Sequence, residues 1–251
     1  MALRDSVAMS IRKSEALTIF SVDFSESSQI VTLYSREYGK LTALAKGSKR
    51  QKSSAFQGGI DLLCQVNVVF YKKRTGLHLL SQCETVENFP GLRKKLQRFY
   101  AASYVADLLA SATVEEQPSA SLYDAALLTL RGLEGSEEVL SVLSFFEATL
   151  LRELGVLPDF SRCADCRQAM VQMCDSPGAT GMLCPRCAAR YGSFRRYSSD
   201  TRRVLEDLAR SVARPQRLAA VPTASAHEIH FLLKSRIVRF LQSETRTMRY
   251  V

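Results

Sequence analysis

Four of the seven cysteines form two Cys-x-x-Cys pairs, Cys163 with Cys166 and Cys184 with Cys187, separated by 17 residues. Each Cys-x-x-Cys turn can place two thiolates on one side of a metal, and two such turns complete the tetrahedral four-sulfur shell that Zn²⁺ prefers. Two unconnected pairs, redox-active or incidental, are the alternative, but a redox function needs only one pair. The spacing therefore predicts one zinc ion. Four thiolates leave no open coordination position, so we expect this zinc to be structural.

The segment that holds these pairs, residues 161–195, is rich in glycine and proline, with Pro177, Gly178, Gly181 and Pro185 between or beside the cysteines. It contains little apolar sequence, and small segments of this kind depend on a metal to fold. We therefore expect an insert whose fold is stabilised by the bound zinc. Cys174 has no partner in the pattern and is expected to be a small packed residue.

Residues 1–85 carry five runs rich in Val, Ile, Leu, Thr and aromatic residues, which predict strands. The runs span residues 15–22, 28–35, 40–46, 60–71 and 76–86. Five short antiparallel strands in this length suit a closed OB-fold barrel, because closure removes exposed sheet edges. A small open sheet is the alternative.

Residues 86–160 change to helical periodicity, with predicted helices at 92–110, 122–133 and 139–154. Gly155 can take the left-handed position after the third helix, and Pro158 prevents its continuation. Residues 196–251 predict two further helices, capped by Ser199 or Asp200 and by Ser225, that return to the helical domain. The second should bury Ile229, Leu232 or Leu233, Ile237 and Phe240. The fold class is thus α+β and multidomain, with barrel, helical bundle and four-cysteine insert.

The formal charge of +9 and a sequence pI of about 9.3 favour a polyanionic partner, nucleic acid first. Counts along the chain give a net charge of +6 for residues 1–80, −6 for 81–160 and +9 for 161–251. No apolar run is long enough to span a membrane, and charges interrupt the N-terminal residues where a signal peptide would be apolar. We therefore expect a soluble, cytoplasmic protein that associates with the nucleoid and not with membranes.

The most concentrated basic segment lies between the third and fourth predicted strands. In a barrel of this kind the loops flank the binding groove, where cations follow phosphates and aromatic rings stack on bases. A solvated loop that only aids solubility is the alternative. Tyr38 and Phe56, which lie near turns, are the expected stacking residues. The predicted DNA-binding residues are Arg36, Lys40, Lys46, Lys49, Arg50, Lys52, Lys72, Lys73 and Arg74.

The start of the first predicted helix is also basic, with Arg93, Lys94, Lys95 and Arg98. Cations oppose the positive end of a helix dipole, which would be easier to understand if an anion bound there. A solvated basic face is the more ordinary interpretation.

Motifs of catalysis are scarce. The three histidines, His78, His227 and His230, lie in no H-x-E or H-E-x-x-H pattern, and the chain has no Gly-x-x-x-x-Gly-Lys-Ser/Thr phosphate loop. We therefore expect a protein that is not an enzyme and has no catalytic residues.

Two stretches resemble the bacterial RecO family of recombination and repair mediators. The first runs from Glu26 to Leu41 and continues from Ala45 to Arg50; the second begins at Phe146-Glu147, passes Leu154-Gly155 and Pro158, and reaches the first Cys-x-x-Cys. The order of barrel, helices and four-cysteine insert also agrees, so the resemblance covers nearly the whole chain.

The resemblance implies an N-terminal OB-fold that binds single- and double-stranded DNA, a central helical domain, and a zinc insert. It implies annealing of complementary strands and, with the partner RecR, loading of the recombinase RecA onto DNA coated by single-strand-binding protein, whose acidic tail is a further partner. The family's basic loop corresponds to Lys46, Lys49 and Arg50, and its zinc ligands to the four cysteines.

Two other functions remain open from the residues alone. An RNA-binding zinc module is one, because small barrels and zinc ribbons also bind RNA. A nuclease with a carboxylate cluster that the sequence does not reveal is the other.

Overall fold

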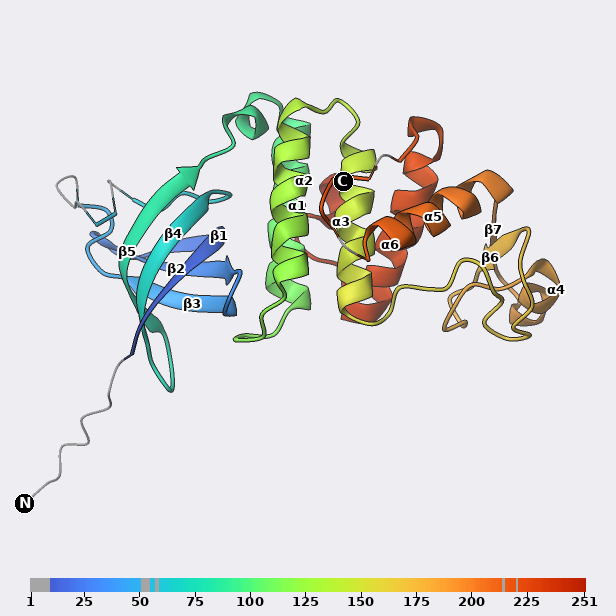
Figure 1. Ribbon diagram of the computed structural model, residues 1–251, viewed down its shortest axis with the longest axis horizontal. Helices are drawn as coiled ribbons and strands as arrows, with labels where there is room; N and C mark the ends of the chain where they lie inside the picture. Colours follow the sequence, from blue (N-terminus) through green and yellow to red (C-terminus); the bar gives the residue numbers. More distant parts are fainter. Residues whose placement is uncertain (1–9, 51–54, 57–58, 214, 220) are drawn as a thin grey trace, which may run out of the picture.

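The chain folds into three parts arranged roughly in a row, with a β-barrel at one end, helices in the middle and the cysteine-rich insert at the other end (Figure 1). The computed structural model describes residues 10–50, 55–56, 59–213, 215–219 and 221–251. Within these ranges, no helix is long and apolar enough to cross a membrane.

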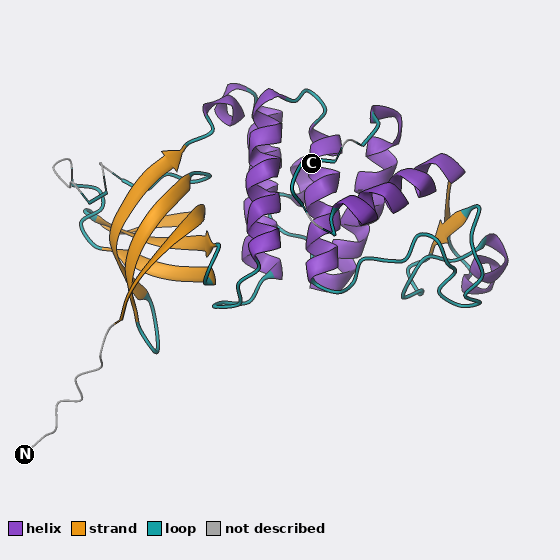
Figure 2. Cartoon of the chain, viewed as in Figure 1, coloured by secondary structure: helices purple, strands orange, loops and turns teal. Residues whose placement is uncertain are grey.

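Five strands close the barrel in the order β1-β2-β3-β5-β4, and β4 pairs with β1 (Figure 2). All neighbours are antiparallel except β3 and β5. This confirms the OB-type barrel over an open sheet. The strands are β1 Ser10–Ser25, β2 Ser28–Ser35, β3 Gly39–Ala45, β4 Gln65–Lys72 and β5 His78–Glu87.

The fourth strand begins five residues later than predicted. Leu63 has a φ of 60°, a left-handed conformation incompatible with a strand. The Thr18 hydroxyl donates to the carbonyl of Asp61 and accepts a hydrogen bond from the amide of Cys64. These contacts hold residues 61–64 beside β1 in an irregular connection.

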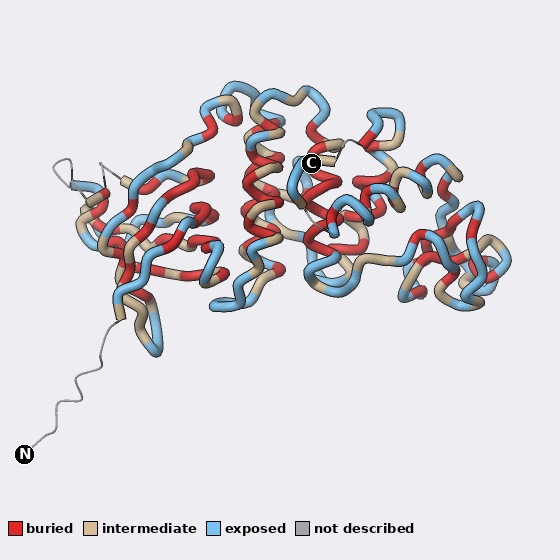
Figure 3. The backbone as a smooth tube through the Cα atoms, viewed as in Figure 1, coloured by how far each residue is buried: buried red, intermediate tan, exposed pale blue. Residues whose placement is uncertain are grey.

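Buried positions alternate with less buried ones along the barrel strands (Figure 3), and the buried side chains of the two faces belong to different cores. Inward side chains such as Val31, Leu33 and Phe70 form the barrel core. Outward side chains Leu17 and Tyr34 belong instead to the core of the helical domain. Part of the outer barrel face is therefore buried under helices, and β1 is the strand that packs on α1.

The helices correspond to the predicted ones with shifted ends. They are α1 Leu96–Ala112, α2 Ala120–Gly135, α3 Val139–Glu153, α4 Pro185–Ala188, α5 Ser199–Ser211 and α6 Thr223–Leu241. Short 3₁₀ turns occur at η1 Pro90–Lys94, η2 Ala189–Tyr191 and η3 Met248–Tyr250. Gly155 takes the predicted left-handed conformation after α3, with a φ of 72°.

Three details of the helix predictions are wrong. α1 starts at Leu96 because residues Pro90–Lys94 form a separate 3₁₀ turn. α5 is capped by Ser198, whose hydroxyl accepts from the amide of Thr201, one position before the expected caps. α6 begins before Ser225, without a side-chain cap, and Phe240 is 43% exposed although Ile229, Leu232, Leu233 and Ile237 are buried.

The helical core contains a buried polar network that the sequence did not reveal as a unit. Glu147 on α3 is completely buried, accepts a 2.7 Å hydrogen bond from the Tyr104 hydroxyl on α1, and lies 3.0 Å from Nδ1 of His230 on α6. Burial by itself lowers the pKa of His230, but the charge and hydrogen bond of Glu147 outweigh it, and the net shift is upward. The network ties three helices together.

Stability should fall as the pH rises through the pKa of His230. Because this pKa is higher in the folded than in the unfolded chain, the folded state binds more protons. The contribution of His230 to the free energy of unfolding is therefore fully present below about pH 6.5. Glu147→Gln should remove this slope. The measurement is the thermal midpoint of wild type and variant from pH 6 to 8.5, and an equal slope in both would contradict the assignment. The comparison of wild type with Glu147→Gln is needed because burial lowers the pKa of His78, and this histidine makes stability rise with pH instead of fall.

Candidate nucleic-acid interface and metal centre

The four predicted zinc ligands come together in one cluster. The sulfur atoms of Cys163, Cys166, Cys184 and Cys187 all lie within 4.8 Å of one another, and those of Cys166 and Cys184 are 3.9 Å apart. A tetrahedral Zn²⁺ with Zn–S bonds of about 2.3 Å requires sulfur separations of about 3.8 Å. Within the described ranges this is the only group of three or more His, Cys, Asp or Glu side chains that could hold a metal.

The electrostatics of the cluster fit a cation. Burial raises the pKa of Cys163, but hydrogen bonds from the amides of Cys166, Cys184 and Asp165 outweigh it and lower the value to about 6. The pKa of Cys187 is raised to about 12 by burial and by the neighbouring thiols. Cys187 can therefore be ionised beside the Cys163 thiolate only with a positive charge next to them, as thiolate metal ligands are.

Local backbone structure positions each cysteine pair. The first pair lies in a turn in which the amide of Arg167, at a φ of 61°, donates to the carbonyl of Cys163. The second pair spans the start of α4, where Cys184 is the N-cap residue and its carbonyl accepts from the amide of Ala188. None of the seven cysteines forms a disulfide.

The expectation that the insert has little apolar mass is wrong. Met170, Met173, Met182 and Leu183 are all buried and belong to the same core as the helices. β6 Met173–Asp175 and β7 Arg195–Tyr197 form a two-stranded sheet that connects the insert to α5. Scattered apolar residues in a loop-rich sequence have no period that identifies them as core.

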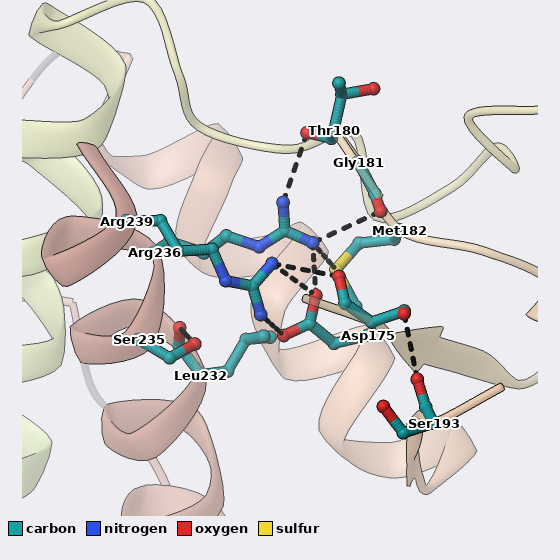
Figure 4. Close-up of polar contacts among 10 residues, drawn as sticks. Asp175, Thr180, Gly181, Met182, Ser193, Leu232, Ser235, Arg236 and Arg239 are labelled. Carbon is teal, nitrogen blue, oxygen red and sulfur yellow. Dashed lines mark hydrogen bonds and ion pairs between the residues drawn. The ribbon is translucent and has the colours of Figure 1, made fainter. Parts of the chain in front are cut away.

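A buried ion-pair cluster joins the insert to α6 (Figure 4). Asp175 on β6 receives Arg236 at 2.5 Å on one carboxylate oxygen and Arg239 at 2.5 Å on the other. Arg236 also donates to the carbonyls of Thr180 and Gly181. Asp175 and Arg236 are each about 93% buried in their side chains, so this contact fixes the insert against the helix.

The basic loop, residues 46–50, is anchored to the β1–β2 hairpin. The amide of Gly47 donates to the Ser28 hydroxyl, the amide of Lys49 donates to the Ser27 carbonyl, and the ammonium of Lys49 lies 2.6 Å from Asp23. Lys46 and Arg50 are exposed and have no ion-pair partner among the described residues. Lys52 lies outside the described residues.

Three of the other predicted DNA-binding cations are engaged between the barrel and the helices. Arg36 makes two 3.0 Å hydrogen bonds to Asp124 on α2. Lys40 donates to the carbonyls of Ala110 and Thr113 at the end of α1, and burial lowers its pKa. Lys72 lies 2.6 Å from Glu116 in the α1–α2 connection.

The turn between β2 and β3 packs closely against the connection between α1 and α2. Gly39 has a φ of 70°, and a Cβ atom there would lie 2.3 Å from the carbonyl oxygen of Gln117. Any larger residue would therefore displace the barrel from the α1–α2 connection.

Lys73 and Arg74 lie in the β4–β5 turn, with no ion-pair partner among the described residues. β5 runs parallel to β3 from the pair Ala43–His78 onward, so the turn before His78 lies toward the start of β3. The basic loop follows the end of β3. The structure thus divides the eight predicted cations that it describes between two ends of the barrel.

Two of the four basic residues at the start of the first predicted helix are paired with an acidic side chain. Lys95 and Arg98 both contact the carboxylate of Glu137, at 2.5 and 2.8 Å, and Arg98 donates to the carbonyls of Glu134 and Ser136 at the end of α2. An anion is not needed to explain these charges.

The expected stacking residues lie inside or against the barrel. Phe56 is 5% exposed, and Tyr38 is half-buried with its ring edge on Phe70, so the prediction for Phe56 is wrong. The exposed aromatic residues of the barrel are Phe20 and Phe24 on β1. Their alternation with polar residues in the sequence was the available signal, but alternation alone does not show which face is covered.

Comparisons with known proteins agree with this architecture. A family model described as "Recombination protein O N terminal" matches residues 9–89, and one described as "Recombination protein O C terminal" matches residues 93–243. The boundary between them falls between β5 and α1.

Curated relatives match both parts. Proteins named "DNA repair protein RecO" are 31% identical over 175 residues in Halalkalibacterium halodurans, 32% over 200 in Rhodopirellula baltica and 34% over 182 in Pelotomaculum thermopropionicum. These alignments cover 70%, 77% and 72% of this chain and 68%, 73% and 70% of the relatives. Because the two family models match residues 9–89 and 93–243, and relatives more than 30% identical cover over two thirds of the chain, the chain belongs to the RecO family of DNA repair and recombination proteins.

Proposed function

We propose that this protein is a recombination mediator that binds single- and double-stranded DNA through the barrel and anneals complementary strands without a covalent step. It helps to load a recombinase onto single-stranded DNA coated by single-strand-binding protein, and its protein partners are RecR and the acidic tail of that binding protein. One structural Zn²⁺ is held by the four cysteines. The protein acts in the cytoplasm, at the nucleoid.

The observation that carries this proposal is the anchored basic loop. Lys46 and Arg50 are exposed without ion-pair partners, and the loop backbone is held by hydrogen bonds to the β1–β2 hairpin. Phosphates bind best to cations whose position is fixed and whose charge is not already neutralised. In OB-folds, ligands bind across the face of the second and third strands and at the β1–β2 and β4–β5 loops. The basic loop follows β3 and is hydrogen-bonded to the β1–β2 hairpin, so it lies beside this ligand surface.

The annealing function is tested with two labelled complementary oligonucleotides. The purified protein should accelerate their pairing equally with and without ATP, because positioning two strands requires no hydrolysis. Sustained ATP turnover would contradict the mechanism. Degradation of the labelled strands with Mg²⁺ would favour the nuclease, and tighter binding of RNA than of DNA of equal sequence at fixed salt would favour the RNA-binding module.

The second expected result concerns salt. Lys46→Gln with Arg50→Gln should weaken DNA binding irrespective of sequence and reduce the slope of log affinity against log salt by roughly 0.7 per lost contact on single strands. The matched control is Lys94→Gln with Arg217→Gln, which removes two exposed cations from other segments, the η1 turn and the α5–α6 connection. If the slope survives in the loop variant but falls when Arg195 and Arg196 are neutralised, the binding surface lies on the C-terminal part.

A further inference from the structure

β1 carries apolar side chains on its outer face beyond the point where the helices cover it. Leu17 and Ile19 are buried in the helical core, whereas Phe20 and Val22 are each 41% exposed. A register shift between Thr18 and Phe20 turns the strand at this boundary. The outer face therefore passes from a covered to an uncovered apolar surface.

The neighbouring strands extend this surface sideways. Val22 pairs with Ile30 on β2, and Ile30 pairs with Leu44 on β3; paired residues share a face of the sheet. Ile30 and Leu44 are only half-buried, while their chain neighbours Val31 and Ala43 point into the barrel core. Phe24 lies at the rim of this surface and is 61% exposed. The apolar platform consists of Phe20, Val22, Phe24, Ile30 and Leu44.

The basic loop lies against one end of the apolar platform. The Lys49–Asp23 ion pair places the loop beside the segment between Val22 and Phe24, and it neutralises the carboxylate nearest the platform. Lys46, exposed, follows Leu44 by two residues at the end of β3. Exposed rings and cations therefore lie side by side.

We propose that the apolar platform receives the bases of single-stranded nucleic acid, with the rings of Phe20 and Phe24 as stacking faces. Unpaired bases expose apolar ring faces, whereas a duplex keeps them stacked inside and presents mainly phosphates to a flat surface. Aromatic rings bordered by cations match the alternation of base and phosphate along a single strand. This inference rests on the proposed DNA-binding function and adds to it a selectivity for unpaired strands.

The test compares one strand with its duplex. Phe20→Ala with Phe24→Ala should weaken binding of a labelled single strand of about 16 thymidines by about tenfold or more, and leave binding of a duplex of equal length within about twofold of wild type. Phe20→Tyr with Phe24→Tyr keeps both rings and should restore single-strand affinity. Phe20→Leu with Phe24→Leu keeps apolar area without rings and should not.

Controls separate stacking from general damage. Leu96→Ala with Phe240→Ala removes two other exposed apolar side chains, from α1 and α6, and should change neither affinity. An equal loss for single strand and duplex in the alanine variant would overturn the platform, as would unchanged affinity for both. If the wild-type protein bound neither oligonucleotide, the proposed function itself would fail, which is a different outcome.

A direct readout follows from the composition. The chain contains no tryptophan, so Phe24→Trp introduces a single indole reporter. Stacking with bases should quench its fluorescence on addition of the single strand and not of the duplex. Fluorescence that is unchanged by a saturating single strand would place the bases elsewhere.

Discussion

Loss of the metal should unfold the insert and loosen the end of the helical domain while the barrel stays folded. In small domains, four-ligand zinc sites supply about 10–16 kcal/mol of apparent free energy at neutral pH. Cys163→Ser, or chelation of the wild-type protein, removes this contribution. The insert shares its core with the helices through Met173 and Leu183, whereas the barrel has a core of its own.

Hydrogen exchange resolved along the chain measures this expectation. Protection should be lost over residues 160–197 and reduced in α6, with the barrel strands unchanged. Elemental analysis should find about one zinc per chain in the wild type and far less in the variant. Cys174→Ala is the matched control, because Cys174 is buried in the insert but lies outside the four-sulfur cluster. Uniform loss of protection, or no zinc in reduced wild-type protein, would contradict the structural role of the metal.

Removing the carboxylate of Asp175 should be the most damaging single change outside the cysteines. Asp175→Asn leaves Arg236 without its buried partner and weakens the hold on Arg239. Breaking a buried pair by removing one partner costs about 3–5 kcal/mol, since the remaining charge is uncompensated. For a chain of this size the thermal midpoint should fall by roughly 10 °C.

The control for this change is Asp207→Asn. Asp207 also pairs with an arginine, Arg210, but both side chains are about 70% exposed. Exposed pairs contribute about 0–1 kcal/mol, so this variant should melt close to wild type. If the two variants have the same midpoint, the buried cluster does not hold the insert on α6.

Local patterns were sufficient for the elements and for the metal ligands. Runs rich in β-branched and aromatic residues predicted all five barrel strands, and helical periodicity predicted the main helices, because both signals are local in the sequence. The two Cys-x-x-Cys turns predicted a four-sulfur cluster, because a tetrahedral shell needs only short-range geometry within each pair and one approach between them. The left-handed conformation at Gly155 was likewise local.

These local patterns could not predict contacts between residues that are far apart in the sequence. Lys40 and Arg36 carry the same charge as Lys46 and Arg50, but they contact α1 and α2 because the β2–β3 turn packs against those helices. Glu147 lies within an apolar helix, and no local pattern predicts that Tyr104 and His230 contact it. Asp175 and its partner Arg236 are 61 positions apart in the sequence.

The sequence by itself determined which residues can bind a metal, form strands or carry charge, since these properties belong to side chains and to their near neighbours in the chain. The tertiary structure decided which of the cations are free and which aromatic rings are exposed. Availability for binding depends on what covers a side chain, and the covering elements here come from distant parts of the chain. α1 and α2 cover the part of the outer barrel face around Leu17 and Tyr34, whereas Phe20 and Phe24 remain exposed among the described residues.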